Sequence, residues 1–308
     1  MKKALVTGGM GFIGGHLVDK LVTMGVEVLV MDKSIYKPTP FSKSSVTVVE
    51  ADLMSAEILK DCLHQVDTCF HLAAISSLAV CNKDWIFSHQ NNVLTFNILL
   101  DILRNTKHRV KLVYASSAAV YGNSSLLPLK EDAPIIPASA YGGDKLSNEL
   151  YAQILASCYG IPSIGLRLFN VYGSGQQESN PYSGVITLFK KVLTEKKPVT
   201  IYGSGDQTRD FIYVADVVEG FIKAATTEAS LTGVFNICTG QTISIKELAL
   251  IMMDLLDSKE PIHYASPRIG DLIHSQGCTK QAQSALGFKA KTPIYQGIEA
   301  MLKAQNTM

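Results

Sequence analysis

A glycine-rich turn between a short apolar segment and an amphipathic helix is the strongest constraint on this chain. Ala4-Leu5-Val6 is followed by Thr7-Gly-Gly-Met-Gly-Phe-Ile-Gly14, and apolar residues then recur at helical spacing as far as Val22. Glycines at positions 8, 11 and 14 permit a tight turn, a close approach of the backbone to a pyrophosphate and close helix–strand packing. The helix that opens at Phe12 and Ile13 presents N–H groups to phosphate. The pattern predicts a dinucleotide site.

The second apolar segment ends in an acidic residue that bears on the choice of dinucleotide. Val26 to Val30 leads to Asp32, which lies eighteen residues after Gly14. A carboxylate there can accept hydrogen bonds from the 2′-hydroxyl of an adenosine ribose and repels a 2′-phosphate, which favours NAD over NADP. The adjacent Lys33 keeps the alternative open, because an ammonium can reach a 2′-phosphate.

Apolar and helical segments alternate through the first half of the chain. After the second strand we expect strands at Val46–Asp52, Thr68–Ala74, Val110–Ser117 and Ser163–Val171, with helices near 55–63, 85–104 and 141–158. The strands are continuous apolar runs, which is typical of a parallel sheet covered on both faces. The pattern predicts a doubly wound, Rossmann-like α/β domain. Six residues fall at the carboxyl ends of strands and should converge on one crevice: Gly8, Asp32, Asp52, Ala73, Ser117 and Asn170.

Beyond residue 172 the pattern loosens into a smaller, mixed lobe that we expect to close over a substrate. It contains loops at 173–181 and 265–278, strands at Val199–Tyr202, Asp210–Val214 and Val234–Cys238, and helices near 184–195, 215–225, 244–256 and 294–304. We therefore assign residues 1–170 to the cofactor domain and 171–308 to the substrate lobe, with parts of 209–240 packing back on the first domain.

Composition argues against several classes of function. The net charge is +1 and charged residues make up 18%, so there is no electrostatic footprint for nucleic acid or an anionic membrane. No apolar segment approaches the roughly 18 residues of a membrane span. The six cysteines are scattered without a Cys-x-x-Cys pair or a Cys/His cluster, which fits a reducing compartment and gives no metal site. We expect a cytoplasmic protein.

A tyrosine and a lysine one helical turn apart indicate the chemistry. Tyr141 and Lys145 follow a Ser116–Ser117 pair in the sequence. A tyrosine is a poor base because its unperturbed pKa is about 10, and a lysine on the same helix face can lower that pKa by favouring the phenolate. A nearby serine hydroxyl can hydrogen-bond the oxygen that gains or loses the proton. A Tyr-x-x-x-Lys pair alone is usually a solvated helix face. Together with the glycine turn, it suits hydride chemistry at a C–OH bond.

Seven motifs occur in order along nearly the whole chain. They are Thr7-Gly-Gly-Met-Gly-Phe-Ile-Gly14, His71-Leu-Ala-Ala74, Ser116-Ser-Ala-Ala-Val-Tyr-Gly122, Tyr141-Gly-Gly-Asp-Lys145, Leu166-Arg-Leu-Phe-Asn-Val-Tyr-Gly173, Gln207-Thr-Arg-Asp-Phe-Ile-Tyr-Val214 and Arg268-Ile-Gly-Asp271. On these motifs the chain resembles the extended short-chain dehydrogenase/reductase family, and within it the NAD-dependent nucleotide-sugar epimerases. One departure, Asn92-Val-Leu-Thr-Phe96, lacks a family-typical glycine, which bears on helix packing there and not on the chemistry.

The resemblance implies a role for each candidate residue. Ser117 hydrogen-bonds the reacting sugar oxygen, Tyr141 is the base, and Lys145 binds the nicotinamide ribose and depresses the pKa of the tyrosine. The cofactor side is completed by Asp52, Leu53, Ala73 and Ala74, with Asp52 touching adenine. The substrate side consists of Asn170, Arg209 and Arg268 on the diphosphate of a UDP-sugar, Tyr202 on the uracil, and Asp271 on the second ribose. Two arginines suit phosphate because a guanidinium donates two hydrogen bonds in a fork.

Ala118-Ala119 separates this chain from neighbouring subfamilies. The 4,6-dehydratases carry an Asp-Glu pair there, and the decarboxylases carry a glutamate two residues before the motif tyrosine. The resemblance therefore implies a 4-epimerase that interconverts UDP-glucose and UDP-galactose. The tyrosinate takes the 4-OH proton while C4 passes a hydride to NAD+, the 4-keto sugar swings about its diphosphate, and the hydride returns to the other face.

Three expectations remain open at this stage. Ser275 occupies a position that acts as a gate in related epimerases, and its small side chain would also admit N-acetylated UDP-hexosamines. A 4-ketosugar reductase using NADPH would share the same three residues, and a non-catalytic NAD-sensing protein would share the fold. Family analogy also implies a homodimer through the helices near 85–104 and 141–158.

Overall fold

The glycine-rich turn lies where the sequence places it, between the first strand and the first helix. The computed structural model describes residues 1–34, 45–106, 108–176, 184–267 and 272–304. Within it, β1 (Lys3–Thr7) leads through the turn to α1 (Phe12–Thr23) and β2 (Glu27–Asp32). The predicted substrate residues Arg268 and Asp271 lie outside the described residues.

Seven parallel strands form the central sheet, in the order β11-β6-β5-β4-β1-β2-β3. The remaining members are β3 (Val46–Glu50), β4 (Thr68–His71), β5 (Lys111–Ser117), β6 (Ser163–Leu168) and β11 (Gly233–Ile237). The strand order reverses between β1 and β4, and ligands bind in such sheets outside the carboxyl ends at that point. The prediction of a doubly wound, Rossmann-like fold is confirmed.

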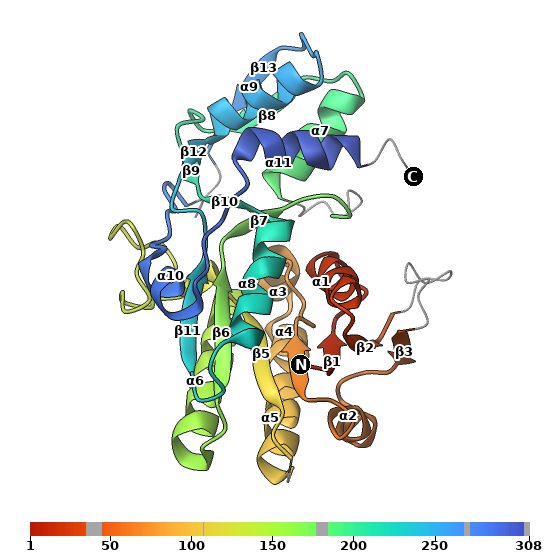
Figure 1. Cartoon of the computed structure of the whole chain (residues 1–308). Helices are drawn as coiled ribbons and strands as arrows, with labels where there is room; N and C mark the ends of the chain where they lie inside the picture. Colours follow the sequence, from red (N-terminus) through yellow and green to blue (C-terminus); the bar gives the residue numbers. More distant parts are fainter. Residues whose placement is uncertain (35–44, 107, 177–183, 268–271, 305–308) are drawn as a thin grey trace.

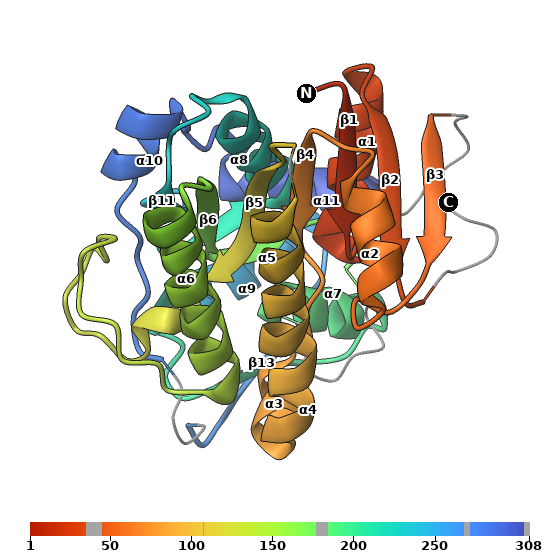
Figure 2. The same ribbon diagram turned by 90° about the horizontal axis from the view of Figure 1, so that it is seen from below.

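Helices cover both faces of the sheet (Figures 1 and 2). On one face lie α2 (Ala56–Leu63), α5 (Thr95–Asn105) and α6 (Ala140–Tyr159), whose side chains form one core with Leu5, Leu29 and Cys69. On the other face α1 and α8 (Val214–Thr226) pack together over a second core, joined by α10 (Lys280–Leu286). Burial of both sheet faces accounts for strands that are apolar throughout.

The helix predicted near 85–104 is not one regular α-helix. It consists of α4 (Trp85–His89), a π-helical turn η1 (Gln90–Leu94) and α5, and a short unpredicted helix, α3 (Leu78–Lys83), precedes it. The hydroxyl of Thr95, which stands in the place of the family glycine, donates to Asn91 O at 2.6 Å. Within the π-turn, Asn92 makes buried contacts, accepting from Ile75 N at 2.8 Å and donating to Asp144 Oδ2 at 3.2 Å, whereas Asn91 lines a cavity described below.

The second lobe is built around a core of its own and two small sheets (Figure 1). It contains α7 (Val185–Thr194), β8 (Val199–Tyr202), β9 (Thr208–Arg209), β12 (Ile243–Ser244), α9 (Ile245–Leu255), β13 (Ile262–Ala265) and α11 (Ile294–Lys303). β8 pairs with β13, and β9 pairs with β12. The sequence did not predict β12, β13 or α10. None of the described helices is long and apolar enough to cross a membrane.

One predicted strand is divided in the structure, and another is shortened. The segment 163–171 becomes β6 and β7 (Asn170–Tyr172), because Phe169 bonds to Ile237 and the chain then turns to a new partner. The segment 210–214 contributes only β10 (Phe211–Tyr213), which pairs with β7, while Val214 already begins α8. β11 and α8 come from the second half of the chain and pack on the first half. The division at residue 170 remains a prediction.

Candidate active site

The glycine-rich turn has the close approaches that a phosphate cradle requires. Gly8 has φ of +71°, and a Cβ there would lie 2.6 Å from Ala73 N. A Cβ on Gly14 would overlap the carbonyl oxygen of Gly8. Helix α1 begins at Phe12 with Gly11 as its N-cap and with no side-chain cap, so a ligand can approach the N–H groups of its first turn.

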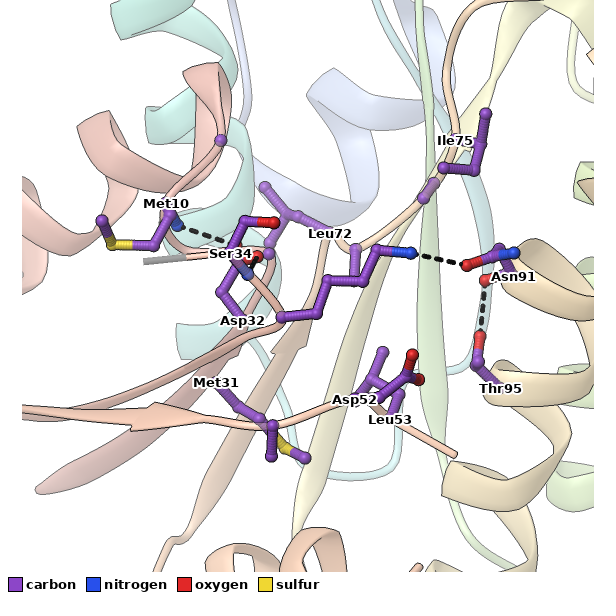
Figure 3. Close-up of a pocket in the computed structure, with 16 residues that line it drawn as sticks. Met10, Met31, Asp32, Ser34, Asp52, Leu53, Leu72, Ile75, Asn91 and Thr95 are labelled. Atoms are coloured by element: carbon purple, nitrogen blue, oxygen red, sulfur yellow. Dashed lines mark hydrogen bonds between the residues drawn. The ribbon is translucent and has the colours of Figure 1, made fainter. Parts of the chain in front are cut away.

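A cavity of about 240 Å³ opens between this turn and the ends of β2, β3 and β4 (Figure 3). Asp32 lines it, and its carboxylate accepts hydrogen bonds from Met10 N at 3.1 Å and Ser34 N at 3.2 Å. Asp52, just beyond the end of the neighbouring strand β3, also lines the cavity, and its carboxylate accepts from Met54 N at 2.9 Å. Leu53, Ala73 and Ala74 complete the predicted set. The hydrogen bond from Met10 N thus holds the carboxylate of Asp32 against the glycine-rich turn.

Lys33 crosses to the helical side of this cavity. Its ammonium donates to Asn91 Oδ1 at 2.8 Å and lies 5.9 Å from the centre of the Phe87 ring. Asn91 and Thr95 line the same cavity, one turn apart on η1 and α5 (Figure 3). Sequence reasoning missed both residues, although their spacing of four places them on one helix face. With its ammonium on Asn91, Lys33 favours the NAD assignment over a 2′-phosphate site.

Ser117 and Tyr141 meet at the carboxyl end of β5. Ser117 caps a short 3-10 turn, η2 (Ala118–Tyr121), by accepting from Ala119 N at 3.1 Å. Helix α6 packs on this turn at Gly142, where a Cβ would lie 2.6 Å from Ala119 O. The hydroxyl of Ser117 is close enough to that of Tyr141 to favour the phenolate of Tyr141. Glycine at position 142 therefore permits the close packing of α6 on η2.

Lys145 is buried, and its ammonium donates to Ala115 O at 2.9 Å. The ammonium lies 5.7 Å from the centre of the Tyr141 ring. Burial lowers the pKa of Lys145 to about 8 and raises the pKa of Tyr141 to about 12. The net pKa of Tyr141 in the chain by itself is therefore above its ordinary value, and the depression of that pKa by Lys145 stays a prediction. The cost of burying a phenolate exceeds the effect of its polar neighbours, so the protein alone holds a neutral tyrosine and a charged lysine at neutral pH.

Ser116, the neighbour of Ser117, belongs to a buried ionic network. Its hydroxyl donates to Glu149, which also receives two hydrogen bonds from Arg167 at 2.9 and 2.7 Å. Arg167 further donates to Tyr121 Oη at 2.8 Å. Forked pairing satisfies charges that would otherwise be costly to bury. The network ties β5, α6 and β6 together beneath Ser117, which makes Ser116 a structural residue.

His71 is buried below the site, at the end of β4. Its Nδ1 bonds to the Thr7 hydroxyl at 2.9 Å, its Nε2 has no hydrogen-bond partner, and its ring lies 5.1 Å from that of Phe96. Burial lowers the pKa of His71 to about 3. The imidazole is therefore neutral in the folded protein at neutral pH.

We predict that His71 makes the fold acid-sensitive. The pKa in the folded state lies below the ordinary value of about 6.5, so the unfolded chain binds a proton that the folded chain cannot bind. Stability from this group is complete above pH 6.5 and falls by up to about 1.4 kcal/mol per pH unit down to about pH 3. Denaturant unfolding at pH 7, 6 and 5 should show a smaller loss for His71→Phe than for the unmodified chain. The exposed His263→Gln is the control, and equal slopes for all three proteins would contradict the prediction.

The remaining candidate residues line two further cavities that continue the first. One, of about 650 Å³, contains Ser117, Tyr141 and Lys145 together with Asn170, Arg209 and Ser275. It shares Gly8, Gly11, Leu72 and Ala74 with the first cavity, which contains the residues predicted to bind adenosine and which we call the adenosine-side cavity. The other, of about 540 Å³, contains Tyr202 and shares Asn170, Val171, Gln176 and Arg209 with the central one. The three cavities form one groove along the carboxyl ends of the strands and into the second lobe.

Two glutamines in the groove were not predicted. Gln176 lines both substrate-side cavities and accepts from the Thr187 hydroxyl at 2.9 Å, while Gln207 donates to Tyr202 O at 2.7 Å. Gln207 opens one of the seven motifs, which was the available signal. Gln176 lies in a loop without periodicity, so nothing in the sequence distinguished it from its polar neighbours.

Comparison with known proteins identifies a family that the chain matches. Residues 4–238 match the model of the NAD dependent epimerase/dehydratase family. A protein described as a putative UDP-glucose 4-epimerase, from Methanocaldococcus jannaschii, is 34% identical, and the alignment covers 97% of this chain and 96% of that protein.

Two solved structures are also similar over the whole chain. One is a UDP-N-acetylglucosamine 4-epimerase from Methanobrevibacter ruminantium in complex with UDP-N-acetylmuramic acid. It has a TM-score of 0.94 and 32% identity, and the match covers 100% of this chain and 99% of that one. The other is MoeE5 in complex with UDP-glucuronic acid and NAD, with a TM-score of 0.90, 33% identity and coverage of 99% and 100%. The descriptions of these proteins all name UDP-sugars, but the sugar differs from one protein to the next.

Proposed function

Because the chain belongs to the NAD-dependent epimerase/dehydratase family, with 4-epimerases of nucleotide sugars among its relatives, we propose that it interconverts UDP-glucose and UDP-galactose. We extend the proposal to the corresponding N-acetylated UDP-hexosamines. The observation that carries it is the placement of Ser117, Tyr141 and Lys145 in a cavity that is continuous with both a dinucleotide cradle and a pocket in the second lobe.

The residues present fit NAD. The glycine cradle leaves room that a Cβ would fill, and Asp32 is aimed into the adenosine-side cavity. We assign the pyrophosphate to Gly8, Gly11 and Gly14 and the adenosine to Asp32, Asp52 and Leu53. The nicotinamide ribose falls to Tyr141 and Lys145. Bound NAD+ supplies a reversible hydride acceptor and a positively charged ring.

The chain's own contribution is proton transfer at one sugar hydroxyl. Tyr141 exchanges a proton with the 4-OH, and Ser117 hydrogen-bonds the same oxygen and stabilises the phenolate. Neutral Tyr141 is the proton donor when the 4-keto sugar is reduced again. Lys145 remains charged at neutral pH, which suits it to hold ribose hydroxyls and to stabilise the phenolate in the transition state. Ala118 and Ala119 line the same cavity without adding a carboxylate, so the reaction stays at one carbon.

Residues that bind the nucleotide, rather than the sugar, suit a reaction in which the sugar ring must rotate within the site. Arg209 lies where the central cavity meets the second-lobe cavity, and Tyr202 lines the far end. We assign the diphosphate to Arg209 and the uracil to Tyr202. Binding energy placed on the nucleotide keeps the complex intact while the sugar rotates between its two hydride-transfer positions.

The direct test uses purified protein without added cofactor. UDP-glucose and UDP-N-acetylglucosamine are incubated separately, and products are resolved by chromatography that separates C4 epimers. Formation of the galacto epimer supports an epimerase that retains NAD. No conversion, even with NAD+ added, would reject the proposal and favour the NADPH-dependent ketosugar reductase, which must release its cofactor at each turnover.

Ser275 provides a test of sugar choice. It is buried in the wall of the central cavity, and its backbone is held there because its N–H donates to Thr208 O at 3.1 Å. We predict that Ser275→Tyr lowers kcat/KM for UDP-N-acetylglucosamine by about 10- to 100-fold relative to UDP-glucose, because the added ring fills space that an N-acetyl group needs. Ser275→Ala is the control and should retain both activities. An unchanged ratio in Ser275→Tyr would remove the gate assignment.

We propose that an exposed apolar surface on α4 and α6 is the interface of a homodimer. Trp85 and Ile86 on α4 are 69% and 71% exposed, and Leu150 and Ile154 on α6 are about half exposed. Exposed apolar side chains of this size, with Leu150 and Ile154 one helical turn apart, indicate an interface. We predict twice the chain mass by size-exclusion chromatography with light scattering, and the monomer mass for the double variant Leu150→Glu, Ile154→Glu. A monomeric unmodified protein would contradict the prediction.

A further inference from the structure

Asp210 is a fully buried carboxylate between β9 and β10 that no step of the proposed reaction uses. Its Oδ1 accepts hydrogen bonds from Thr239 N at 2.9 Å and from the Thr239 hydroxyl at 2.6 Å. Its Oδ2 accepts from Gly240 N at 2.9 Å and Gly277 N at 3.2 Å. All four donors are uncharged, and burial raises the pKa of this carboxyl although the hydrogen bonds oppose the shift. Burying a carboxylate costs free energy of folding. The segments that its hydrogen bonds hold together therefore indicate what the protein gains from it.

The carboxylate joins three segments that are distant in the sequence. They are the β9–β10 connection, the turn after β11, and the segment 272–278. Gly240 has φ of +75°, and a Cβ on Gly277 would lie 2.5 Å from the Sγ of Cys238. The two backbone N–H groups therefore reach Asp210 through geometries that favour glycine. This arrangement specifies where the three segments meet.

Two of these segments carry Arg209, Leu272 and Ser275, which together with Asn170 on β7 we define as the substrate-side wall of the central cavity. Asn170 Nδ2 donates to Asp210 O at 2.9 Å. Thr208 N donates to Ile273 O at 3.0 Å, and Ser275 N donates to Thr208 O at 3.1 Å. Each wall residue is thus either next to Asp210 in the chain, bonded to its backbone, or on a segment that its carboxylate holds. The carboxylate itself does not line the cavity.

We propose that Asp210 is a positioning residue that fixes the substrate-side wall and thereby sets the affinity for a nucleoside-diphosphate sugar. The proposal rests on the proposed function. Asp210 brings Arg209, our diphosphate ligand, into register with Ser275, our sugar gate. A residue with a purely structural role would change the stability of the fold and leave the affinity of the folded protein for nucleotide unchanged.

The principal test is Asp210→Asn, which keeps the shape of the side chain and directs an NH2 group at a donor. Leaving a buried donor unsatisfied should raise KM for the UDP-sugar by about 10- to 100-fold with kcat largely retained. The Kd for UDP alone, measured by calorimetry, should rise by the same factor. The NAD content of the purified protein should not change, because Asp210 lines neither of the cavities that contain Gly8 and Gly11.

Two further variants separate positioning from general destabilisation. Thr239→Val removes one of the four hydrogen bonds while preserving side-chain volume, and it should weaken UDP binding by up to about tenfold. It carries the test if Asp210→Asn does not fold. Asp216→Asn is the matched control, because Asp216 is also buried but accepts from Lys291 N and Thr292 N before α11. It should lower the melting temperature and leave UDP binding unchanged.

The outcomes distinguish this inference from the proposed function. Folded Asp210→Asn or Thr239→Val protein with the UDP affinity of the unmodified chain would overturn the role of Asp210 alone. So would equal weakening in Asp216→Asn. If the unmodified protein binds no UDP, the proposed function fails, and the role of Asp210 fails with it.

Discussion

Replacing Tyr141 by phenylalanine is expected to lower kcat for 4-epimerisation by roughly 10²- to 10⁴-fold, which is the usual contribution of a positioned acid or base. The variant removes one oxygen, the partner of the Ser117 hydroxyl, and leaves the ring beside Lys145. Because the protein alone raises the pKa of Tyr141 to about 12, we do not expect the hydroxyl to contribute to the fold through its charge. The measurement is the rate of C4 epimer formation at saturating UDP-glucose.

The control for this loss is Tyr151→Phe on the same helix, where the side chain is about half exposed. It should retain the rate of the unmodified protein. Tyr141→Phe should also keep its bound NAD and its melting temperature, so that the loss can be assigned to the chemical step. A Tyr141→Phe protein with more than a tenth of the original rate would exclude Tyr141 as the acid and base.

Replacing Gly14 by alanine is expected to empty the cofactor site. The new Cβ would overlap Gly8 O and lie 2.8 Å from Gly9 Cα, which are backbone atoms that cannot move aside without opening the turn. Overpacking of this kind costs about 1–3 kcal/mol, which corresponds to roughly one to two orders of magnitude in NAD affinity. We predict that the protein purifies without NAD and shows epimerase activity only with NAD+ added in excess.

Gly15 supplies a control that differs by one position. A Cβ there would meet only Gly9 O, at 3.9 Å, and alanine is a better helix former than glycine by about 1 kcal/mol. Gly15→Ala should therefore keep its NAD and melt at the same or a higher temperature. NAD content is measured by absorbance after denaturation of each purified variant. Equal NAD content in Gly14→Ala and Gly15→Ala would show that the turn does not hold the pyrophosphate.

Some features of this protein were predictable because they depend on a few neighbouring residues. The turn at Gly8 to Gly14 and the helix that carries Tyr141 and Lys145 are of this kind, since spacing along one strand or one helix fixes which side chains share a face. The continuous apolar strands predicted the covered parallel sheet in the same way. Short elements were missed. The strand β12 has two residues, and its existence depends on pairing with β9 rather than on its own sequence.

The properties of charged groups were the least predictable. Sequence spacing suggested that Lys145 would depress the pKa of Tyr141, but burial raises it. Lys33 could reach a 2′-phosphate on sequence grounds, yet it donates to Asn91, which is 58 residues away. Ser116 and Ser117 are adjacent and chemically identical, but only Ser117 lies beside Tyr141, while Ser116 bonds to the buried Glu149.

By itself the sequence determined the parallel α/β fold, the glycine-rich turn between β1 and α1 and the order of the motifs along the chain, because local periodicity and backbone freedom are encoded in adjacent residues. Only the tertiary structure decided which serine lies beside Tyr141 and in which direction the pKa of Tyr141 shifts. It also decided that the carboxylate of Asp210, the neighbour of Arg209, bonds to the segment that carries Ser275. Those outcomes depend on burial and on hydrogen bonds between residues far apart in the chain, and local sequence carries no direct record of either.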